Sequence, residues 1–274
     1  MPTLSIITIN FNNAQGLLKT IESVDVQTFT DFEYIVVDGL STDGSLDIIK
    51  QYKQSTNHPF NYIYEPDSGV YNAMNKGILL ATGEYLLFLN SGDFLVDKNV
   101  LQNVFNKQES ADILYGGSHI SDNMKIVCTI DPPENITFGS LYNYGLAHQS
   151  TFIKRSMFDI NGLYREDFKY NSDIDFWYRA IILNNATTKK IGLIISDYNL
   201  DGISSKEYNT EAYKSEIKQI MKQSNFDKFI PDYDAWKYEH ENMEVMYWVK
   251  SKKMLYGLLV ATYNFSTWLV QKLK

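Results

Sequence analysis

The chain has 274 residues, of which 44% are hydrophobic and 21% are charged, and its formal net charge is −8. This is the composition of a globular protein, and the negative balance argues against a nucleic-acid binder, whose surface would be basic. The single cysteine, Cys128, excludes an intrachain disulfide, and its apolar surroundings predict that it is buried in the core. No run of 18 apolar residues predicts a membrane span, and residues 4–9 are typical of a first strand rather than a signal peptide.

Strands and helices alternate in the first half of the sequence. Residues 4–9 are β-branched and apolar, residues 10–13 form a polar turn that can cap a helix, and Leu17, Ile21 and Val24 follow at helical spacing. The same order repeats with strands at 34–37, 61–64 and 83–89. Such alternation predicts an α/β fold with a mostly parallel sheet and right-handed crossovers.

The second half is less regular. Residues 112–117 and 125–128 predict a hairpin, and residues 147–153 and 190–196 predict two further strands. A helix is expected from Ser172 to about Leu183, and from about Lys206 the chain becomes polar and helical. Trp177 is expected in the core, and Lys76 is expected to be an exposed helical lysine.

Polar residues follow four consecutive predicted strands. Ligands of parallel sheets bind outside the carboxyl ends of the strands, and those ends carry Asn10, Asn12, Asp38, Asp67, Asn90 and Asp93. The glycine-rich motifs of dinucleotide and P-loop sites are absent. Since carboxylates repel phosphate unless a divalent cation lies between them, this edge predicts a ligand with a base, a ribose and a metal-bound diphosphate. The alternative is that Asp38 and Asp67 only begin turns and cap helices.

Three segments carry a family resemblance. Residues 35–45 (IVVDGLSTDGS) resemble the IVVDDGSTDGS signature of family 2 glycosyltransferases. Residues 65–77 (EPDSGVYNAMNKG) look like the EPDSGIYDAMNKG segment of members that build bacterial surface polysaccharides, and residues 83–93 (GEYLLFLNSGD) are similar to the strand that carries the DxD motif. The resemblance spans about residues 3–180. It implies the GT-A fold, with a Rossmann-like sheet, a smaller mixed acceptor-side region and a helical C-terminal tail.

The resemblance also implies roles for individual residues. Asp38 matches the carboxylate that accepts from a uracil-type base, and Asp67 matches an acidic residue near ribose and base. The remaining expected donor-binding residues are Thr8, Asn10, Asn12, Asn90, Ser91 and His148. Asp93 matches the metal ligand, for Mg²⁺ or Mn²⁺. Because Asn90 and Gly92 stand where the family has aspartates, metal binding is expected to rest on Asp93.

A proton acceptor is expected near residue 173. Asp173 matches the aspartate of the family's ED motif, the general base of inverting transfer, and the start of a helix keeps a carboxylate ionised. Ser172 and Asp175 have the spacing of a capping box, which gives Asp175 a structural explanation and makes it the weaker candidate. His148 is expected either near the diphosphate or acceptor, or as a buried histidine with its contacts satisfied. Residues 201–205 resemble a late family segment that closes over the donor.

The last residues form a basic apolar tail. Residues 245–274 hold five lysines among aromatic and aliphatic residues and no acidic residue. This pattern is typical of a helix on an anionic membrane surface, or of a helix packed on its own domain or on a dimer partner. The expected division is a nucleotide-sugar half at 1–115, an acceptor and base half at 116–205, and a helical extension at 206–274.

The leading hypothesis is an inverting glycosyltransferase that uses a nucleotide-diphospho sugar, with UDP as the expected nucleotide, and a saccharide or lipid-linked saccharide acceptor. It is expected in the bacterial cytoplasm or on the inner face of the plasma membrane, without a nucleic-acid partner. The alternatives are a non-catalytic sugar-nucleotide or glycan-binding module and a nucleotidyltransferase.

Overall fold

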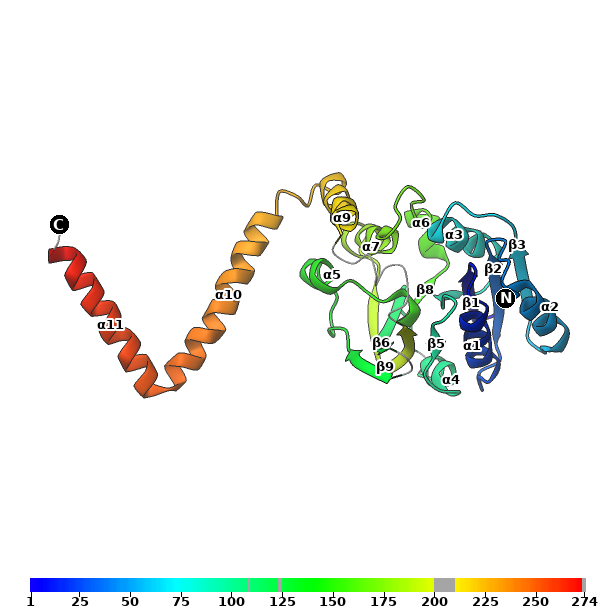
Figure 1. Cartoon of the computed structure of the whole chain (residues 1–274), viewed down its shortest axis with the longest axis horizontal. Helices are drawn as coiled ribbons and strands as arrows, with labels where there is room; N and C mark the ends of the chain where they lie inside the picture. The colour runs from blue at the N-terminus through cyan, green and yellow to red at the C-terminus, as the bar shows by residue number, and fades with distance from the viewer. Residues whose placement is uncertain (108, 123–124, 200–209, 273–274) are drawn as a thin grey trace. The chain divides into compact units, whose positions relative to one another are not determined.

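The structure is a computed structural model that describes residues 1–107, 109–122, 125–199 and 210–272 (Figure 1). The chain divides into two compact units, Met1–Ile217 and Lys218–Lys274. The first unit contains the sheet, and the second contains α10 (Ile230–Ser251) and α11 (Lys253–Lys272). Helix α9 (Glu211–Gln223) runs across the boundary. The separate roles expected for residues 1–115 and 116–205 stay a prediction.

Strands and helices alternate in the first half of the chain, as predicted. Its elements are β1 (Leu4–Asn10), α1 (Ala14–Asp25), β2 (Phe32–Asp38), α2 (Ser45–Ser55), β3 (Phe60–Tyr64), α3 (Val70–Leu80) and β4 (Tyr85–Phe88). The four strands pair in parallel in the order β3-β2-β1-β4. Asn13 caps α1, because its Oδ1 accepts from the Gly16 N–H at 3.1 Å. Every residue of β1 is buried, as a central parallel strand requires.

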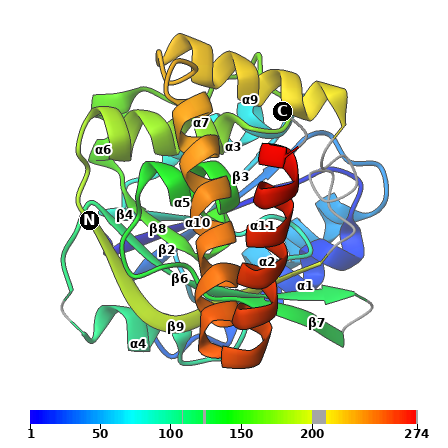
Figure 2. The ribbon, with the colours of Figure 1, turned by 90° about the vertical axis from the view of Figure 1, so that its left-hand side faces the viewer.

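The second half makes the sheet mixed. Its elements are β5 (Phe94–Leu95), α4 (Val100–Phe105), β6 (Ile113–Asp122), β7 (Lys125–Ile130), α5 (Phe138–Tyr144), the 3₁₀ helix η1 (His148–Ser150), β8 (Thr151–Lys154), α6 (Ser156–Asn161), α7 (Ser172–Trp177), the π-helix η2 (Tyr178–Leu183) and β9 (Thr188–Asn199). The sheet continues β4-β8-β6-β9-β5, and β7 pairs with β6. Strand β8 is antiparallel to β4 and β6, whereas β9 is parallel to β6. Figure 2 shows the long strands β6 and β9 side by side.

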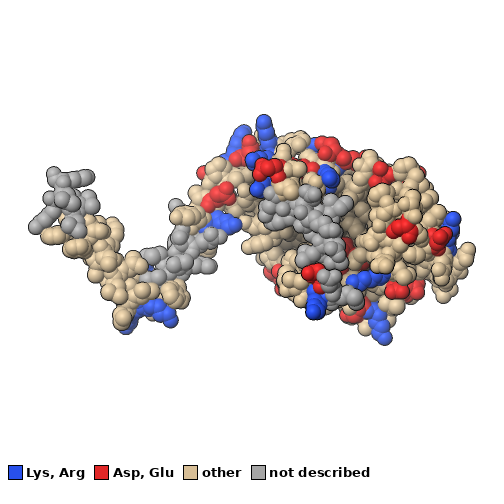
Figure 3. All heavy atoms as spheres, in the orientation of Figure 1, with Lys and Arg blue, Asp and Glu red and all other residues tan. Residues whose placement is uncertain are grey.

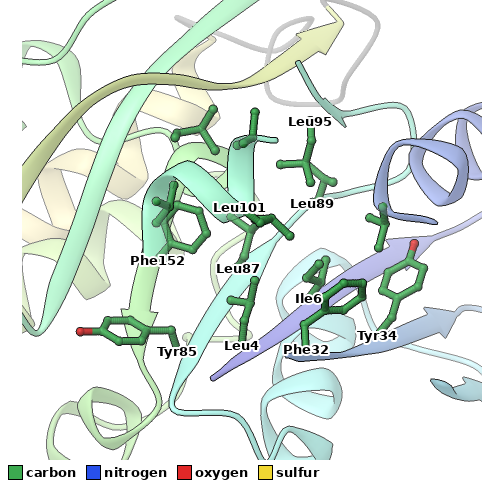
Figure 4. Packing of buried hydrophobic residues seen from close by; sticks show 14 of the residues in the cluster. Leu4, Ile6, Phe32, Tyr34, Tyr85, Leu87, Leu89, Leu95, Leu101 and Phe152 are labelled. Carbon is green, nitrogen blue, oxygen red and sulfur yellow. The ribbon is translucent and has the colours of Figure 1, made fainter. Parts of the chain in front are cut away.

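Helices cover both faces of the sheet, as expected. On one face, α1, α2 and α4 pack on a cluster that includes Leu4, Ile6 and Leu87 (Figure 4). On the other face, α3 lies close to β1, because a Cβ on Gly77 would lie 2.4 Å from Ile7 Cγ2. The ring of Phe88 packs there against Phe158 of α6, with ring centroids 6.2 Å apart. The strand ends are therefore the part of the sheet left for a ligand.

Two expectations about the second half are wrong in detail. Residues 147–153 were expected to form one strand, but their first part is η1, because the Ser150 N–H bonds back to the Ala147 carbonyl at 3.0 Å. Cys128 lies in the predicted hairpin but is exposed rather than buried. It lies on β7, all six residues of which are exposed. An apolar strand at the end of a hairpin is buried only if another element covers it.

Candidate active site

One short hydrogen bond joins the carboxyl ends of β1 and β2. Asn10 and Asp38 are opposite each other in the parallel register, and Asn10 Nδ2 donates to Asp38 Oδ2 at 2.6 Å. The second carboxylate oxygen, Asp38 Oδ1, accepts from the Ser41 N–H at 2.7 Å. Both Asn10 and Asp38 are buried. Asp38 therefore lies beneath the edge of the sheet and fixes Asn10 and the loop after β2.

The loops after β1 and β2 are locked to each other. The Asn12 N–H donates to Ser41 Oγ at 2.8 Å, and the Thr42 N–H donates to Asn12 Oδ1 at 2.8 Å. Asn12 and Leu40 have positive φ angles of 49° and 65°. This left-handed conformation costs a residue with a side chain roughly 1–2 kcal/mol. Backbone strain of this kind collects at binding sites, and here it shapes the two loops that surround Asn10.

Asn10 leaves one polar atom for a ligand, whereas Thr8 leaves none. Asn10 Oδ1 is buried and has no hydrogen-bond partner among the residues that the structure describes, which is rare for a polar atom. The Thr8 hydroxyl donates to the Leu89 carbonyl at 2.7 Å and accepts from the Tyr34 hydroxyl at 2.9 Å. Thr8 is fully buried. It therefore holds β1 against its neighbours, and its expected role in donor binding stays a prediction.

Asp67 reaches the same edge because Gly39 has no side chain. A Cβ at residue 39 would lie 2.4 Å from Asp67 Oδ2 and 3.2 Å from Phe11 Cδ2. Asp67 Oδ1 accepts from the Gly69 N–H at 3.0 Å, which fixes the carboxylate. Phe11 is 65% exposed beside it. Phe11 was not among the predicted site residues. The sequence feature that could have pointed to it is an aromatic residue inside a polar turn.

The loop after β4 is fastened to α1. Asn13 Nδ2 donates to the Ser91 carbonyl at 3.0 Å. The Thr20 hydroxyl donates to the Asp93 carbonyl at 2.7 Å and accepts from the Gly92 N–H at 3.0 Å. Gly92 has a φ of 107°, which residues with a side chain rarely adopt. This backbone conformation favours glycine at residue 92, where family 2 glycosyltransferases, which the sequence resembles, have an aspartate.

Asp93 is a carboxylate in an unfavourable environment. Burial raises its pKa to about 7, the charge of His148 opposes this shift, and the charge of Asp197 adds to it. Asp197, on β9, is 6% exposed. Its Oδ2 accepts from Ser121 Oγ at 2.8 Å, and its Oδ1 has no partner in the described part of the chain. A cation would relieve the repulsion between these two carboxylates. No sequence motif pointed to Asp197.

A chain of side chains joins Asp173 to the end of β4. Asp173 Oδ2 lies 3.3 Å from His148 Nδ1, and His148 Nε2 lies 3.2 Å from Asn90 Nδ2. Asp173 Oδ1 accepts from the Tyr71 hydroxyl at 3.0 Å and from the Ile174 N–H at 2.9 Å. The structure thus brings together three of the predicted site residues from three separate segments.

The protonation of His148 follows from these contacts. Burial lowers its pKa, but the hydrogen bond to Asp173 and the charges of Asp173 and Asp93 outweigh that effect, so the pKa of His148 is raised. The neutral ring fits both neighbours if Nδ1 donates to Asp173 and Nε2 accepts from Asn90. Asn90 Oδ1 is then an acceptor, and it has no hydrogen-bond partner among the described residues. Burial and the Asp173 charge also raise the pKa of Tyr71 well above its usual value, which keeps its hydroxyl a donor.

The predicted capping box at the start of α7 is wrong. The N-cap residue is Asn171, and no side chain caps the helix. Asp175 instead pairs with Arg179, whose Nε lies 2.8 Å from Asp175 Oδ2. The side chain of Asp175 is 7% exposed and that of Asp173 is 16% exposed. Asp175 thus has a structural role through Arg179, and Asp173 is the more accessible carboxylate.

Two neighbouring residues have structural roles. Trp177 is buried, as predicted, and its Nε1 donates to the Leu146 carbonyl at 3.2 Å. Lys76 Nζ lies 2.7 Å from Glu65 Oε1, so Lys76 forms an ion pair where the sequence predicted only an exposed lysine. Residues 201–205, expected to close over the donor, lie outside the described residues.

Three chemical groups therefore share one edge of the sheet. The amide and carboxylate cluster around Asn10 suits a heterocyclic base and a ribose, and the loop with Asp93 suits a cation that carries phosphates. The hydrogen-bonded carboxylate of Asp173 is chemically able to accept a proton from a hydroxyl group.

Comparison with known proteins agrees with this chemistry. A family model described as Glycosyl transferase family 2 matches residues 5–162. The chain is 31% identical over 224 residues to the PGL/p-HBAD biosynthesis glycosyltransferase of Mycobacterium bovis (strain BCG / Pasteur 1173P2), covering 78% of this chain and 83% of that protein. It is 27% identical over 231 residues to the Escherichia coli UDP-Glc:alpha-D-GlcNAc-diphosphoundecaprenol beta-1,3-glucosyltransferase WfaP, covering 84% and 87% of the two chains.

Among solved structures, S. aureus TarS 1–349 in complex with UDP-GlcNAc has a similar fold. The TM-score is 0.57 at 23% sequence identity, and the match covers 72% of this chain and 58% of TarS 1–349. That likeness supports the GT-A fold that the sequence predicted. The family model and the curated relatives identify the protein further: the chain belongs to glycosyltransferase family 2.

Proposed function

We propose that this glycosyltransferase moves a sugar from a UDP-sugar to a hydroxyl group of a saccharide or lipid-linked saccharide, with inversion at the anomeric carbon. The observation that carries the proposal is the chain of contacts from Asp173 through His148 to Asn90. These contacts link Asp173, the proposed proton acceptor, to the loop that holds Asp93. Direct displacement needs a base that takes the proton of the incoming hydroxyl. It also needs groups that stabilise the charge of the group leaving the same carbon.

The loops after β1 and β2 form the nucleoside end of the proposed site. Asn10 Oδ1 supplies a buried acceptor, and Phe11 offers an exposed ring on which a base can stack. Asp67 supplies a carboxylate for ribose hydroxyls. Asp38 contributes by fixing Asn10, since one of its carboxylate oxygens accepts from Asn10 and the other accepts from the Ser41 N–H. A direct hydrogen bond from the base to Asp38 stays a prediction.

Asp173 performs the proton transfer in the proposed step. Its carboxylate accepts the proton of the acceptor hydroxyl, whose oxygen attacks the anomeric carbon opposite the leaving group. The bond from that carbon to the diphosphate oxygen breaks, and its electron pair leaves with the nucleoside diphosphate. The hydroxyl of Tyr71 and the ring of His148 contact one carboxylate oxygen each, which keeps Asp173 in one orientation.

The residues after β4 fit a hard divalent cation, Mg²⁺ or Mn²⁺. Asp93 supplies a carboxylate, and Asn90 Oδ1 is an amide oxygen without a partner in the described part of the chain; such ions prefer oxygen ligands of this kind. Within the described residues, no three His, Cys, Asp or Glu side chains gather as a metal site, so a cation held here would need further oxygen ligands from the diphosphate and water. A bound cation would neutralise charge on the departing diphosphate.

The substitution Asp173→Asn tests the base. It removes the proton acceptor but keeps the size of the side chain, so we expect kcat for transfer to fall about 10²- to 10⁴-fold while UDP affinity by calorimetry changes less than about twofold. The matched control is Asp159→Asn, at an exposed carboxylate on α6, which should change neither quantity. Transfer at the wild-type rate by Asp173→Asn, with donor bound normally, would show that Asp173 is not the base.

Cation binding should depend on pH through Asp93. Its pKa of about 7 means that the carboxylate is half protonated near neutral pH in the metal-free protein, and a cation needs the ionised form. In the presence of UDP, Mn²⁺ affinity should therefore rise roughly tenfold per pH unit below about pH 7 and level off above it. Asp93→Asn should abolish both the binding and its pH dependence. A Mn²⁺ affinity that does not change with pH in calorimetric titrations contradicts this role of Asp93.

The second unit exposes an apolar helix. No helix in the described part of the chain is apolar over a stretch long enough to span a bilayer. Large apolar side chains are nevertheless exposed around α11: Met254, Leu258, Leu259, Tyr263, Phe265 and Trp268. A helix that is apolar on all sides needs a partner to cover it. Figure 3 shows basic side chains at the bend between α10 and α11, where Lys252 and Lys253 lie.

An anionic membrane surface is the partner we propose for α11. The negative cytoplasmic leaflet attracts lysines close to it, and apolar side chains enter the boundary between headgroups and acyl chains. No acidic residue follows Glu244 to oppose this attraction. A lipid-linked acceptor is anchored in the same bilayer, so the proposed place of work is the inner face of the bacterial plasma membrane.

Vesicle sedimentation tests the membrane contact. The full chain should bind vesicles of phosphatidylcholine with phosphatidylglycerol, and Lys252→Gln with Lys253→Gln should weaken that binding roughly 30-fold. The matched control, Lys218→Gln with Lys222→Gln on α9, removes the same charge and should have little effect. A chain that dimerises in analytical ultracentrifugation and binds no vesicles contradicts the membrane proposal and identifies a second copy as the partner.

A further inference from the structure

The segment just before Asp173 is held by a carboxylate from a distant helix. Glu216 lies on α9 and accepts hydrogen bonds from three consecutive backbone N–H groups. Its Oε1 accepts from Lys169 at 2.7 Å, and its Oε2 accepts from Tyr170 and Asn171 at 3.0 Å each. Successive N–H groups that point at one anion form a nest, and hydrogen bonds to a charged acceptor are stronger than neutral ones.

The same carboxylate holds the residue at which α7 begins. Asn171 is the N-cap residue of α7, but its side chain makes no capping hydrogen bond. Instead, Asn171 Nδ2 donates to Glu216 Oε2 at 3.0 Å and to the Tyr213 carbonyl at 3.2 Å. Asn171 is fully buried. The start of α7 is therefore fixed to α9 through both its backbone and its side chain, and Asp173 lies in the first turn that follows.

A second contact holds this segment from the donor side. The Tyr71 hydroxyl, on α3, lies 2.9 Å from the Tyr170 carbonyl and 3.0 Å from Asp173 Oδ1, and its single proton is shared between these two acceptors. Residue 170 is thus held by Tyr71 at its carbonyl and by Glu216 at its N–H. Tyr71 precedes this stretch in the sequence and Glu216 follows it. If either contact is lost, only the other one still fixes the position of Asp173.

We propose that Glu216 is a positioning residue for Asp173, through the backbone of residues 169–171. This inference rests on the proposed function, in which Asp173 is the base. A misplacement of about 1 Å in a reacting group can lower a rate about 100-fold. Glu216 therefore affects the rate of proton transfer and leaves the nucleoside site, which is built from β1, β2 and β4, unchanged. Helix α9 begins well beyond residue 162, where the family match ends.

The test compares Glu216→Ala and Glu216→Gln with the matched control Glu211→Ala on the same helix. The Glu211 side chain is 90% exposed and pairs only at 3.6 Å with Lys214 in the described residues. We expect Glu216→Ala to lower kcat for transfer about 10- to 100-fold with little change in KM for the donor. Glu216→Gln keeps the shape and one acceptor oxygen, so a smaller loss is expected. Glu211→Ala should match the wild type.

Two readouts separate positioning from a general effect on folding. Formate fits the space left by Glu216→Ala and restores an anion to the nest, so it should recover part of the lost kcat, whereas neutral formamide should not. Hydrogen exchange of the amides at residues 169–171 should be roughly tenfold faster in Glu216→Ala, since each loses its acceptor. Wild-type kcat in Glu216→Ala would overturn the proposal, as would a loss of donor affinity that accompanies the loss of rate without formate rescue.

The Asp173→Asn variant distinguishes a failure of the positioning role of Glu216 from a failure of the proposed function. If Asp173→Asn abolishes transfer and Glu216→Ala does not lower it, only the positioning role fails. If Asp173→Asn transfers normally, the base assignment itself fails, whatever the Glu216 variants do.

Discussion

The parallel pairing of β1 with β2 and β4 determines where the polar groups of the site lie. In this register the last residues of β1 and β2, Asn10 and Asp38, are opposite each other, and the loop after β4 begins beside them. The apolar strands bury their own length, so polar side chains are tolerated only where the strands end. The short bond from Asn10 to Asp38 keeps both groups at that edge. Nucleoside, diphosphate and acceptor contacts can then be arranged along one line of the sheet.

The proposed base, Asp173, lies on α7, outside the sheet, and contacts from other elements link it to this edge. His148 connects Asp173 to Asn90, Tyr71 connects it to α3, and Glu216 connects its segment to α9. Each contact comes from a separate stretch of chain. The burial that raises the pKa of Asp93 would also make its attraction to a bound cation stronger than in water.

Local patterns were enough to predict the alternating half of the fold, because strand burial and helix spacing depend on near neighbours in sequence. They failed where several structures fit the same local pattern. Cys128 is exposed because no other element covers its strand, and Asp175 pairs with Arg179, one helical turn further on, instead of capping α7. The motifs singled out Asp173, His148 and Asn90 separately, and the structure shows that their side chains are in contact. Asp197 and Glu216 could not be predicted, because each reaches the site across a long sequence separation and belongs to no local motif.

We propose that the polar edge of this sheet binds a nucleoside diphosphate linked to a sugar. The most direct measurement is the melting temperature of the full chain with a panel of nucleotide-diphospho sugars, once with Mn²⁺ and once with EDTA. A ligand that binds only the folded chain raises the melting temperature by mass action. We expect UDP-sugars to raise the melting temperature with Mn²⁺ and to raise it less with EDTA. If no UDP-sugar raises it under either condition, this edge of the sheet is not a UDP-sugar site.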